Sequence, residues 1–158
     1  METSSNQAVQ AYWEAFVRLG TIDPAAAEAG YQAWPFGSNP EMADRLGALV
    51  LQGIKTATAS LVWSYEADDQ PYPVVGGYSI ILDGRGQPIC ILQTTRIYVA
   101  PFDEVDEEQA YLEGEGDRTL QYWRDVHWQF FEEECRQLGR NPDPKMPVVC
   151  ERFTLVHQ

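Results

Sequence analysis

The sequence predicts an α+β protein, and the order of its hydrophobic patterns is the main reason. Helical periodicity comes first, alternating β-type runs follow from Gly76, and an acidic segment with a long helix separates them from a last strand-like run. This order differs from the repeated strand–helix units of a parallel α/β fold. A chain of 158 residues is also the size of one domain.

The N-terminal third is predicted to be helical. Residues 4–19 place Ala8, Tyr12, Ala15, Phe16 and Leu19 on one face, and Gly20 ends that helix. Asp23-Pro24 is a start signal for a second helix over residues 25–33. We expect residues 1–33 to form a helical extension that packs on the outside of a single domain spanning residues 1–158.

The next helix has clearer end signals. An aromatic turn, Trp34-Pro35-Phe36-Gly37, leads into Ser38-Asn39-Pro40-Glu41, where a hydroxyl followed by Glu three residues later is a capping-box pattern. We expect a helix over residues 40–52, with Met42, Leu46, Leu49 and Val50 inward. Gly53 suits the left-handed residue after it.

Two strands and a tight turn are expected next. Residues 78–82 and 88–99 flank Asp83-Gly84-Arg85-Gly86, and Asp-Gly between apolar runs is a strong hairpin signal. Both faces of the second strand are mixed, as in a small barrel. Gln93, Thr94 and Thr95 either line the barrel mouth or pair across strands, and the sequence favours neither interpretation.

The C-terminal third is predicted to contain two helices and a strand. Residues 106–112 are expected to form a short helix, which Gly114 and Gly116 end. Asp117 is expected to cap a long helix over residues 118–138. Residues 148–156 are expected to form the last strand.

Composition limits the classes of function. The net charge of −13 weighs against binding to DNA or long RNA, which requires a basic surface, and suits a small neutral or cationic ligand. The three cysteines are widely spaced, which favours buried thiols in a reducing cytoplasm over disulfides or a zinc site. The chain has neither a secretory signal nor an apolar run of membrane-spanning length, so no membrane partner is expected.

The residues richest in chemistry lie between Gly53 and Ser60. Lys55 lies among hydroxyl side chains, with no acid before Glu66, and a lysine three residues before Thr58 can supply a charged group and an oxygen nucleophile. The alternative is a solvated turn with an exposed lysine.

This segment, Gly53-x-Lys55-x-x-Thr58-x-Ser60, resembles the ASCH-domain signature Gly-x-Lys-x-x-Ser/Thr-x-Arg. Ala110-x-x-Glu113 is similar to that family's downstream acidic motif, and the order of the two motifs fits. The resemblance implies a PUA-like small mixed β-barrel with helices packed around it. It also implies, from ASCH amidohydrolases that act on N(4)-acetylcytidine, a catalytic group of Lys55, Thr58 and Glu113.

Within that resemblance, Thr58 is the expected nucleophile, and Lys55 either activates it or stabilises an oxyanion. A carboxylate close to Lys55 would keep the ammonium protonated and favour the electrostatic role. Glu113 would then serve as a general base if apolar surroundings raised its pKa. The sequence leaves these roles open.

One position departs from the family pattern, since Ser60 replaces its arginine. Arg124 is a candidate replacement, although a surface ion pair with Asp125 or with an acid one turn away is the simpler explanation. We predict Ser60, Trp63, Arg124 and Phe36 as substrate-binding residues, with Trp34 and Tyr65 as further stacking candidates. His127 is interpreted as a hydrogen-bonded core histidine rather than a base.

No cofactor and no metal ligand set are predicted, although a loose divalent site on Glu113, Glu115 and Asp117 stays an option. The first functional hypothesis is hydrolysis of the acyl amide of a modified nucleoside such as N(4)-acetylcytidine. The alternatives are a ribonuclease or RNA-binding module, and a non-catalytic regulator that binds a nucleotide or other small ligand. The expected oligomeric state is a monomer or a homodimer.

Overall fold

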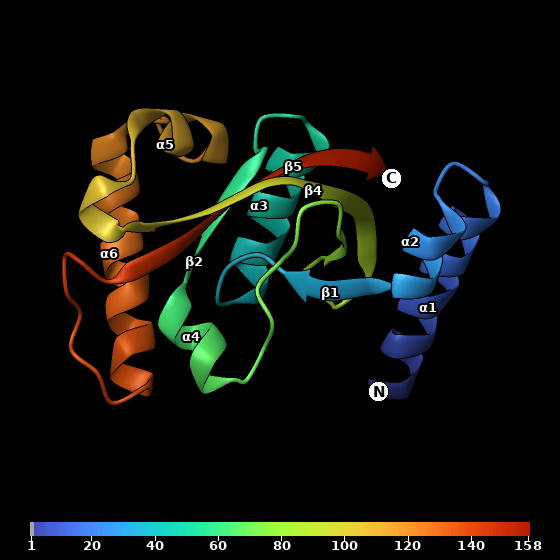
Figure 1. Cartoon of the computed structure of the whole chain (residues 1–158), viewed down its shortest axis with the longest axis horizontal. Coiled ribbons are helices and arrows are strands. Elements are labelled where there is room, and N and C mark those ends of the chain that lie inside the picture. Colours follow the sequence, from blue (N-terminus) through green and yellow to red (C-terminus); the bar gives the residue numbers. More distant parts are fainter. Residues whose placement is uncertain (1) are drawn as a thin grey trace.

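A curled five-stranded sheet organises the chain (Figure 1). The computed structural model describes residues 2–158. The strands are β1 (Tyr31–Pro35), β2 (Ala57–Leu61), β3 (Tyr78–Leu82), β4 (Pro88–Pro101) and β5 (Pro147–His157), in the order β1-β3-β4-β5-β2. β1 pairs with β3 in parallel and all other neighbours are antiparallel. The mixed half-barrel and its helices confirm the predicted α+β, PUA-like class.

The helices lie in groups at the two ends of the sheet and across its middle (Figure 1). One end carries α1 (Glu2–Arg18) and α2 (Pro24–Ala29), and the other carries α5 (Glu107–Glu113) and α6 (Leu120–Gln137). Between them lies α3 (Pro40–Leu51), and two short helices complete the set, α4 (Val62–Ala67) and η1 (Phe102–Glu104).

Opposite faces of the sheet bury different helices. Leu46 and Val50 of α3 pack with Ile81, Leu92 and Phe153. Trp13 and Phe16 of α1 pack instead with Ile80 and Ile91. Neighbouring residues of a strand point to opposite faces, so α1 covers the outside of the curl and α3 fills its inside. The N-terminal helix α1 therefore packs on the opposite face of the sheet from α3.

A third apolar cluster joins α6 to the sheet. Trp123, Phe131 and Cys135 of α6 lie against Phe102 and Val148. This packing places the N-terminal half of α6, where Trp123 and His127 lie, beside β2 and α5. All three cysteines are free and buried, as the sequence predicted.

Two of the strands were not predicted. The helix expected over residues 25–33 ends at Ala29, where Gly30 has φ 82°, and Tyr31–Pro35 forms β1. Ala57–Leu61, for which no strand was predicted, forms β2 against β5. Both errors concern short edge strands, whose pairing partners are far away in the sequence.

Several helix ends differ by one or two residues. Asn39, rather than Ser38, caps α3 by accepting from Met42 N, and Thr119, rather than Asp117, caps α6. The carboxylate of Asp117 accepts from the hydroxyl of Thr119 at 2.6 Å. On α1 the buried residues include Val9 and Trp13, whereas the predicted inward residue Leu19 is 61% exposed.

The remaining elements agree with the sequence analysis. The hairpin of β3 and β4, helices α3, α5 and α6, and strand β5 all form close to their expected bounds. On β4, Thr94 donates from Oγ1 to Glu151 Oε1 at 2.8 Å, which is the cross-strand alternative, and Thr95 lies exposed at an irregularity in the pairing. Among residues 2–158, no helix is both long and apolar enough to cross a membrane.

Candidate active site

Two segments distant in sequence lie backbone to backbone at the site. The turn after α3 begins with Gly53 at φ 76°, and Thr56 N then donates to Leu112 O at 2.8 Å. Gly114 allows this approach, because a Cβ there would lie 2.7 Å from Ile54 O. The C-terminal end of α5 is therefore held against the residues that precede β2, which brings the two predicted motifs together.

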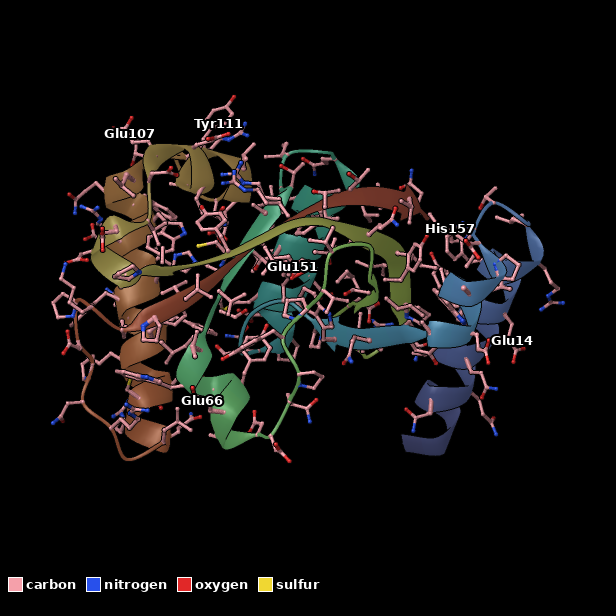
Figure 2. The ribbon with its side chains drawn as sticks, viewed as in Figure 1. Glu14, Glu66, Glu107, Tyr111, Glu151 and His157 are labelled. Atoms are coloured by element: carbon pink, nitrogen blue, oxygen red, sulfur yellow. The ribbon has the colours of Figure 1, made fainter. Side chains whose placement is uncertain are left out.

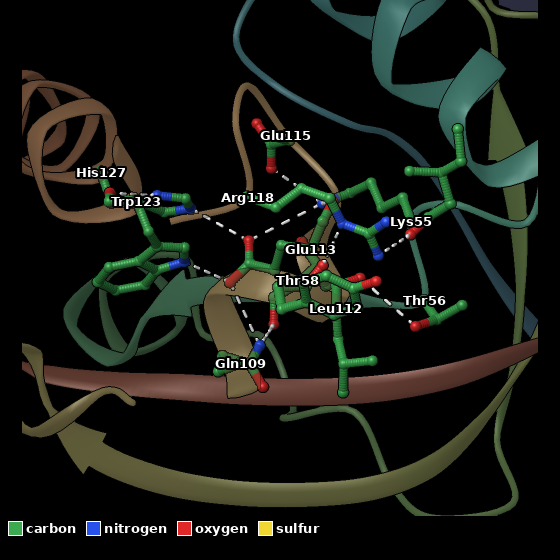
Figure 3. A network of polar contacts seen from close by, with 12 residues as sticks. Lys55, Thr56, Thr58, Gln109, Leu112, Glu113, Glu115, Arg118, Trp123 and His127 are labelled. Atoms are coloured by element: carbon green, nitrogen blue, oxygen red, sulfur yellow. Dashed lines mark hydrogen bonds and ion pairs between the residues drawn. The ribbon is translucent and has the colours of Figure 1, made fainter. Parts of the chain in front are cut away.

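Lys55 is buried between these segments (Figure 3). Only 2% of the residue is exposed. Its ammonium lies 3.0 Å from Glu115 Oε2 and 3.8 Å from Glu113 Oε1, and donates to the carbonyl of Glu113 at 3.4 Å. The ring centroid of Phe36 lies 5.2 Å away. The alternative of a solvated, exposed lysine is therefore wrong.

Glu113 lies among Lys55, Trp123 and His127 (Figure 3). Its Oε2 accepts from Trp123 Nε1 at 2.5 Å and from Gln109 Nε2 at 3.3 Å, and its Oε1 lies 3.2 Å from His127 Nε2. Burial raises the pKa of Glu113, but the charges of His127 and Lys55 and the Trp123 hydrogen bond outweigh it and leave that pKa at about 2. Glu113 is therefore a carboxylate at neutral pH. The sequence predicts a general base at Glu113 only if its surroundings raise its pKa, and they lower it instead.

His127 has acceptors at both ring nitrogens. Nδ1 lies 2.8 Å from the carbonyl of Trp123 and Nε2 faces Glu113, while the ring stacks on Trp123 at a centroid distance of 4.2 Å. A carbonyl and a carboxylate can only accept, so the two contacts favour the doubly protonated imidazolium. Burial lowers the pKa of His127, but the charge and hydrogen bond of Glu113, the charge of Glu115 and the contact with the Trp123 carbonyl together raise it above its ordinary value. The prediction of a hydrogen-bonded core histidine is consistent with this environment.

The four charged side chains form a balanced group, which we call the ionic cluster: Lys55, Glu113, Glu115 and His127. Glu113, Glu115 and His127 have donor atoms within 4.8 Å of one another, as a metal site would. The ammonium of Lys55, however, lies against both carboxylates and supplies the positive charge there. Asp117, expected in a loose divalent site, is instead hydrogen-bonded to Thr119.

A cavity of about 370 Å³ opens on the inside of the curled sheet. The two edge strands both line it, β1 through Gln32 and Trp34 and β2 through Thr58 and Ser60. Other lining residues come from the end of β1, from the centre of the sheet, from α4 and the segment after it, and from α6. They include Phe36, Ser79, Glu151, Ser64, Tyr65, Asp68, Gln70, Pro71, Tyr72, Pro73, Phe130 and Glu134.

Thr58 and Phe36 connect the cavity to the ionic cluster. The backbone carbonyl of Thr58 accepts from Gln109 Nε2 at 3.1 Å, and the same nitrogen donates to Glu113. Thr58 also lines the cavity, and so does Phe36, whose ring contacts the Lys55 ammonium. Lys55 and Glu113 themselves are buried behind these two residues.

The predicted site residues therefore divide into three groups. Lys55 and Glu113 lie together in the ionic cluster, and Thr58, Ser60 and Phe36 line the adjoining cavity. Trp63 and Arg124 are outside the cavity lining. Arg140 lies over the ring of Trp63 at 3.6 Å, and Arg124 donates to the carbonyl of Asp103 at 3.1 Å, rather than to an acid one turn away.

Sequence reasoning missed three side chains at the site. Gln109 joins Thr58 to Glu113, and Glu134 and Glu151 line the cavity. The sequence did contain a signal for Glu151. It and Arg152 are the two charged residues in the otherwise apolar run Val148–Phe153. Burial raises the pKa of both Glu134 and Glu151, partly opposed by hydrogen bonds from Ser64 and Thr94.

The chain is similar to a known family model and to solved structures. The family model of the ASCH domain matches residues 32–157. Protein EF3133 from Enterococcus faecalis V583 has a similar crystal structure, with 36% identity and a TM-score of 0.84, over 96% of this chain and 89% of that one. An ASCH domain from Lactobacillus crispatus JV V101 has 29% identity and a TM-score of 0.83, over 100% and 97% of the two chains.

A more distant structure, the hypothetical protein PH0355, shares the fold at 22% identity and a TM-score of 0.50, over 79% of this chain and 100% of that one. A search of curated proteins found no match.

Proposed function

Because the chain belongs to the ASCH domain family, we propose that it is a hydrolase that cleaves the acyl amide of a modified nucleoside such as N(4)-acetylcytidine. Membership of this family suggests an RNA-related or hydrolase-like function. The observation that carries the finer proposal is the position of Thr58, which lines the cavity and is joined through Gln109 to the ionic cluster.

The cavity supports a nucleoside-sized ligand. Its volume of about 370 Å³ is at the lower end of the range for small-molecule pockets. Aromatic rings supply flat surfaces on which a base can stack, and they come from Trp34, Tyr65, Tyr72 and Phe130.

The charges of the cavity favour a ligand without phosphate. None of its lining residues, all of which the structure describes, is a lysine, arginine or histidine, whereas Asp68, Glu134 and Glu151 are acids. Like charges disfavour an anionic ligand in such a site. This counts against RNA as the direct ligand and in favour of a free nucleoside.

Thr58 is the proposed nucleophile, since its side chain lies on the cavity. Lys55, with two carboxylates within 4 Å, acts as a fixed positive charge beside the cavity rather than as a base. Glu113, with its pKa at about 2, positions Lys55 and His127 and does not exchange protons at neutral pH. The reaction so described uses the hydroxyl of Thr58 and water, and it involves no cofactor.

Two substitutions at Thr58 test this proposal by hydrolysis of N(4)-acetylcytidine. Thr58→Val removes the hydroxyl at nearly constant shape and is expected to lower kcat by about 100-fold or more, and Thr58→Ser is expected to retain activity. Thr154→Val is the matched control, because it makes the same substitution at an exposed position of the neighbouring strand β5, outside the cavity lining.

Full activity in Thr58→Val would contradict the role of Thr58. If the wild type left the acetyl amide intact but cut a short single-stranded RNA, the ribonuclease alternative would replace the proposal. Saturable binding of cytidine with no turnover of either substrate would indicate a non-catalytic regulator.

A further inference from the structure

Glu151 lies directly opposite Thr58 in the sheet. In the antiparallel pairing of β2 with β5, Thr58 is the register partner of Glu151. Residues paired in this way share a face, and their Cβ atoms lie about 4.5–5.5 Å apart. Both residues also line the cavity. A glutamate carboxyl in this position is within reach of the threonine hydroxyl.

The surroundings of Glu151 leave one carboxyl oxygen available. Glu151 lies on β5 near the middle of the molecule (Figure 2) and is 5% exposed. Its Oε1 accepts from Thr94 Oγ1 at 2.8 Å. Among the described residues, neither a hydrogen bond of Oε2 nor an ion pair of this side chain is found, so no cation neutralises the carboxylate.

The two buried glutamates on either side of Thr58 are therefore suited to different tasks. Glu113 is held as a carboxylate by two cations and a Trp hydrogen bond, so it has little affinity for a proton. Burial without a cationic partner raises the pKa of Glu151 and makes it a better proton acceptor. The amino group of Lys55 is engaged in ion pairs with Glu115 and Glu113.

We propose that Glu151 is a further catalytic residue, which takes the proton of the Thr58 hydroxyl and delivers it to the leaving nitrogen. This inference rests on the proposed acyl-amide hydrolysis. The position of Glu151 opposite Thr58, its place on the cavity wall and its free carboxyl oxygen together carry it.

The proton moves in two balanced halves. First, Glu151 accepts the hydroxyl proton as Thr58 Oγ1 bonds to the acyl carbon, and it returns that proton to the amide nitrogen as the C–N bond breaks. The products are the amino nucleoside and an acyl ester on Thr58. Next, Glu151 accepts a proton from water as the water oxygen attacks the ester, and the proton passes to Thr58 Oγ1 as the carboxylic acid leaves.

Acylation of Thr58 by p-nitrophenyl acetate, followed by intact and peptide mass spectrometry, tests Thr58 and Glu151 without the nucleoside. The p-nitrophenolate leaving group of this ester departs without a proton, so the only proton transfer required is removal of the proton from Thr58. Wild type is expected to acquire an acetyl group on Thr58, and Glu151→Gln to slow that step by about 100-fold or more. Glu132→Gln is the matched control, since it makes the same change at an exposed position of α6 outside the cavity lining, and it is expected to retain the rate.

The inference is overturned if Glu151→Gln is acylated at Thr58 as fast as Glu132→Gln, or if wild type is not acylated at Thr58. Parallel assays with N(4)-acetylcytidine separate it from the proposed function. Rapid Glu151-dependent acylation by the ester, with no hydrolysis of the nucleoside, would support the role of Glu151 and reject the substrate.

Discussion

His127 and Glu113 each stabilise the charge of the other inside the protein. The side chain of Glu113 is 1% exposed and that of His127 is 12% exposed, so water screens their interaction only weakly. The shift of the Glu113 pKa from its ordinary value of 4.5 to about 2 corresponds to roughly 3 kcal/mol. Such a pair makes the stability of the fold depend on pH in both directions.

We expect the stability contribution of this pair to be greatest between about pH 4.5 and 6.5, the ordinary values of the two groups. The pKa of Glu113 is lowered on folding, so its contribution is present above pH 4.5 and is lost as pH falls towards 2. The pKa of His127 is raised on folding, so its contribution is present below pH 6.5 and is lost as pH rises through the raised value.

Urea denaturation of wild type and His127→Gln over a range of pH measures this dependence. The free energy of unfolding of the variant should lack most of the decline that wild type shows above pH 6.5. Parallel curves for the two proteins in that range would show that His127 is not held as an imidazolium. The ¹⁵N chemical shifts of its ring in wild type provide a second, direct readout.

At the residue scale, the sequence could predict some of the site and not the rest. Lys55, Thr58 and Glu113 belong to two motifs with a fixed order, so their proximity could be predicted. The place of Glu151 opposite Thr58 depends on the register between β2 and β5, which local sequence does not specify. Arg124 fitted the chemistry of a missing arginine, but α6 directs it to the carbonyl of Asp103.

Among the elements, the junction of α5 with the turn before β2 decides whether the ionic cluster forms. Arg118, at φ 64°, strengthens this junction by donating to the carbonyls of Tyr111 and Ile54, and its guanidinium lies 3.7 Å from the Tyr111 ring. Gly114 permits the close approach. The lysine and its two glutamates therefore depend on backbone contacts as well as on their own charges.

Gly114→Ala is expected to be more destabilising than Gly139→Ala. Both glycines have left-handed backbones, at φ 73° and φ 70°, so both substitutions carry the cost of about 1–2 kcal/mol for a side chain in that conformation. Only at Gly114 would the new Cβ meet another backbone, at 2.7 Å from Ile54 O, whereas nothing lies within 4 Å at Gly139.

Chemical denaturation of the two variants measures the difference, and the hydrolysis rate reports whether the cluster has moved. Equal losses of stability in both variants would mean that the two segments can separate without cost.

At the same scale, strands were harder to predict than helices. The helices α3 and α6 have long periodic faces and local caps, so their existence followed from nearby residues. The strands β1 and β2 have five residues each, and their hydrogen-bonding partners lie in β3 and β5. Their alternation was too short to distinguish a strand from a turn or a helix end.

For the whole molecule, the net charge of −13 and the acidic cavity act in the same direction. We expect kcat/KM for N(4)-acetylcytidine to exceed that for its 5′-monophosphate by about tenfold at low salt, since each nearby charge contributes about 1 kcal/mol in water at 4 Å. Added salt should reduce the difference.

Asp68→Asn, at an exposed position of the cavity wall, should also reduce the discrimination between the two substrates, whereas Asp125→Asn, on an exposed part of α6 outside the cavity lining, serves as the control. A preference for the monophosphate at low salt would contradict the assignment of an uncharged ligand.

The separation of the ionic cluster from the cavity wall has an evolutionary consequence. Four of the lining residues, Gln70, Pro71, Tyr72 and Pro73, belong to the segment between α4 and β3. Among the described residues, no ion pair joins this segment to the ionic cluster. Mutations in this segment can reshape what the cavity accepts and leave the charged group intact. After gene duplication, one copy of the protein can therefore acquire a new substrate through changes in this exposed segment, while the buried ionic cluster keeps its residues and contacts.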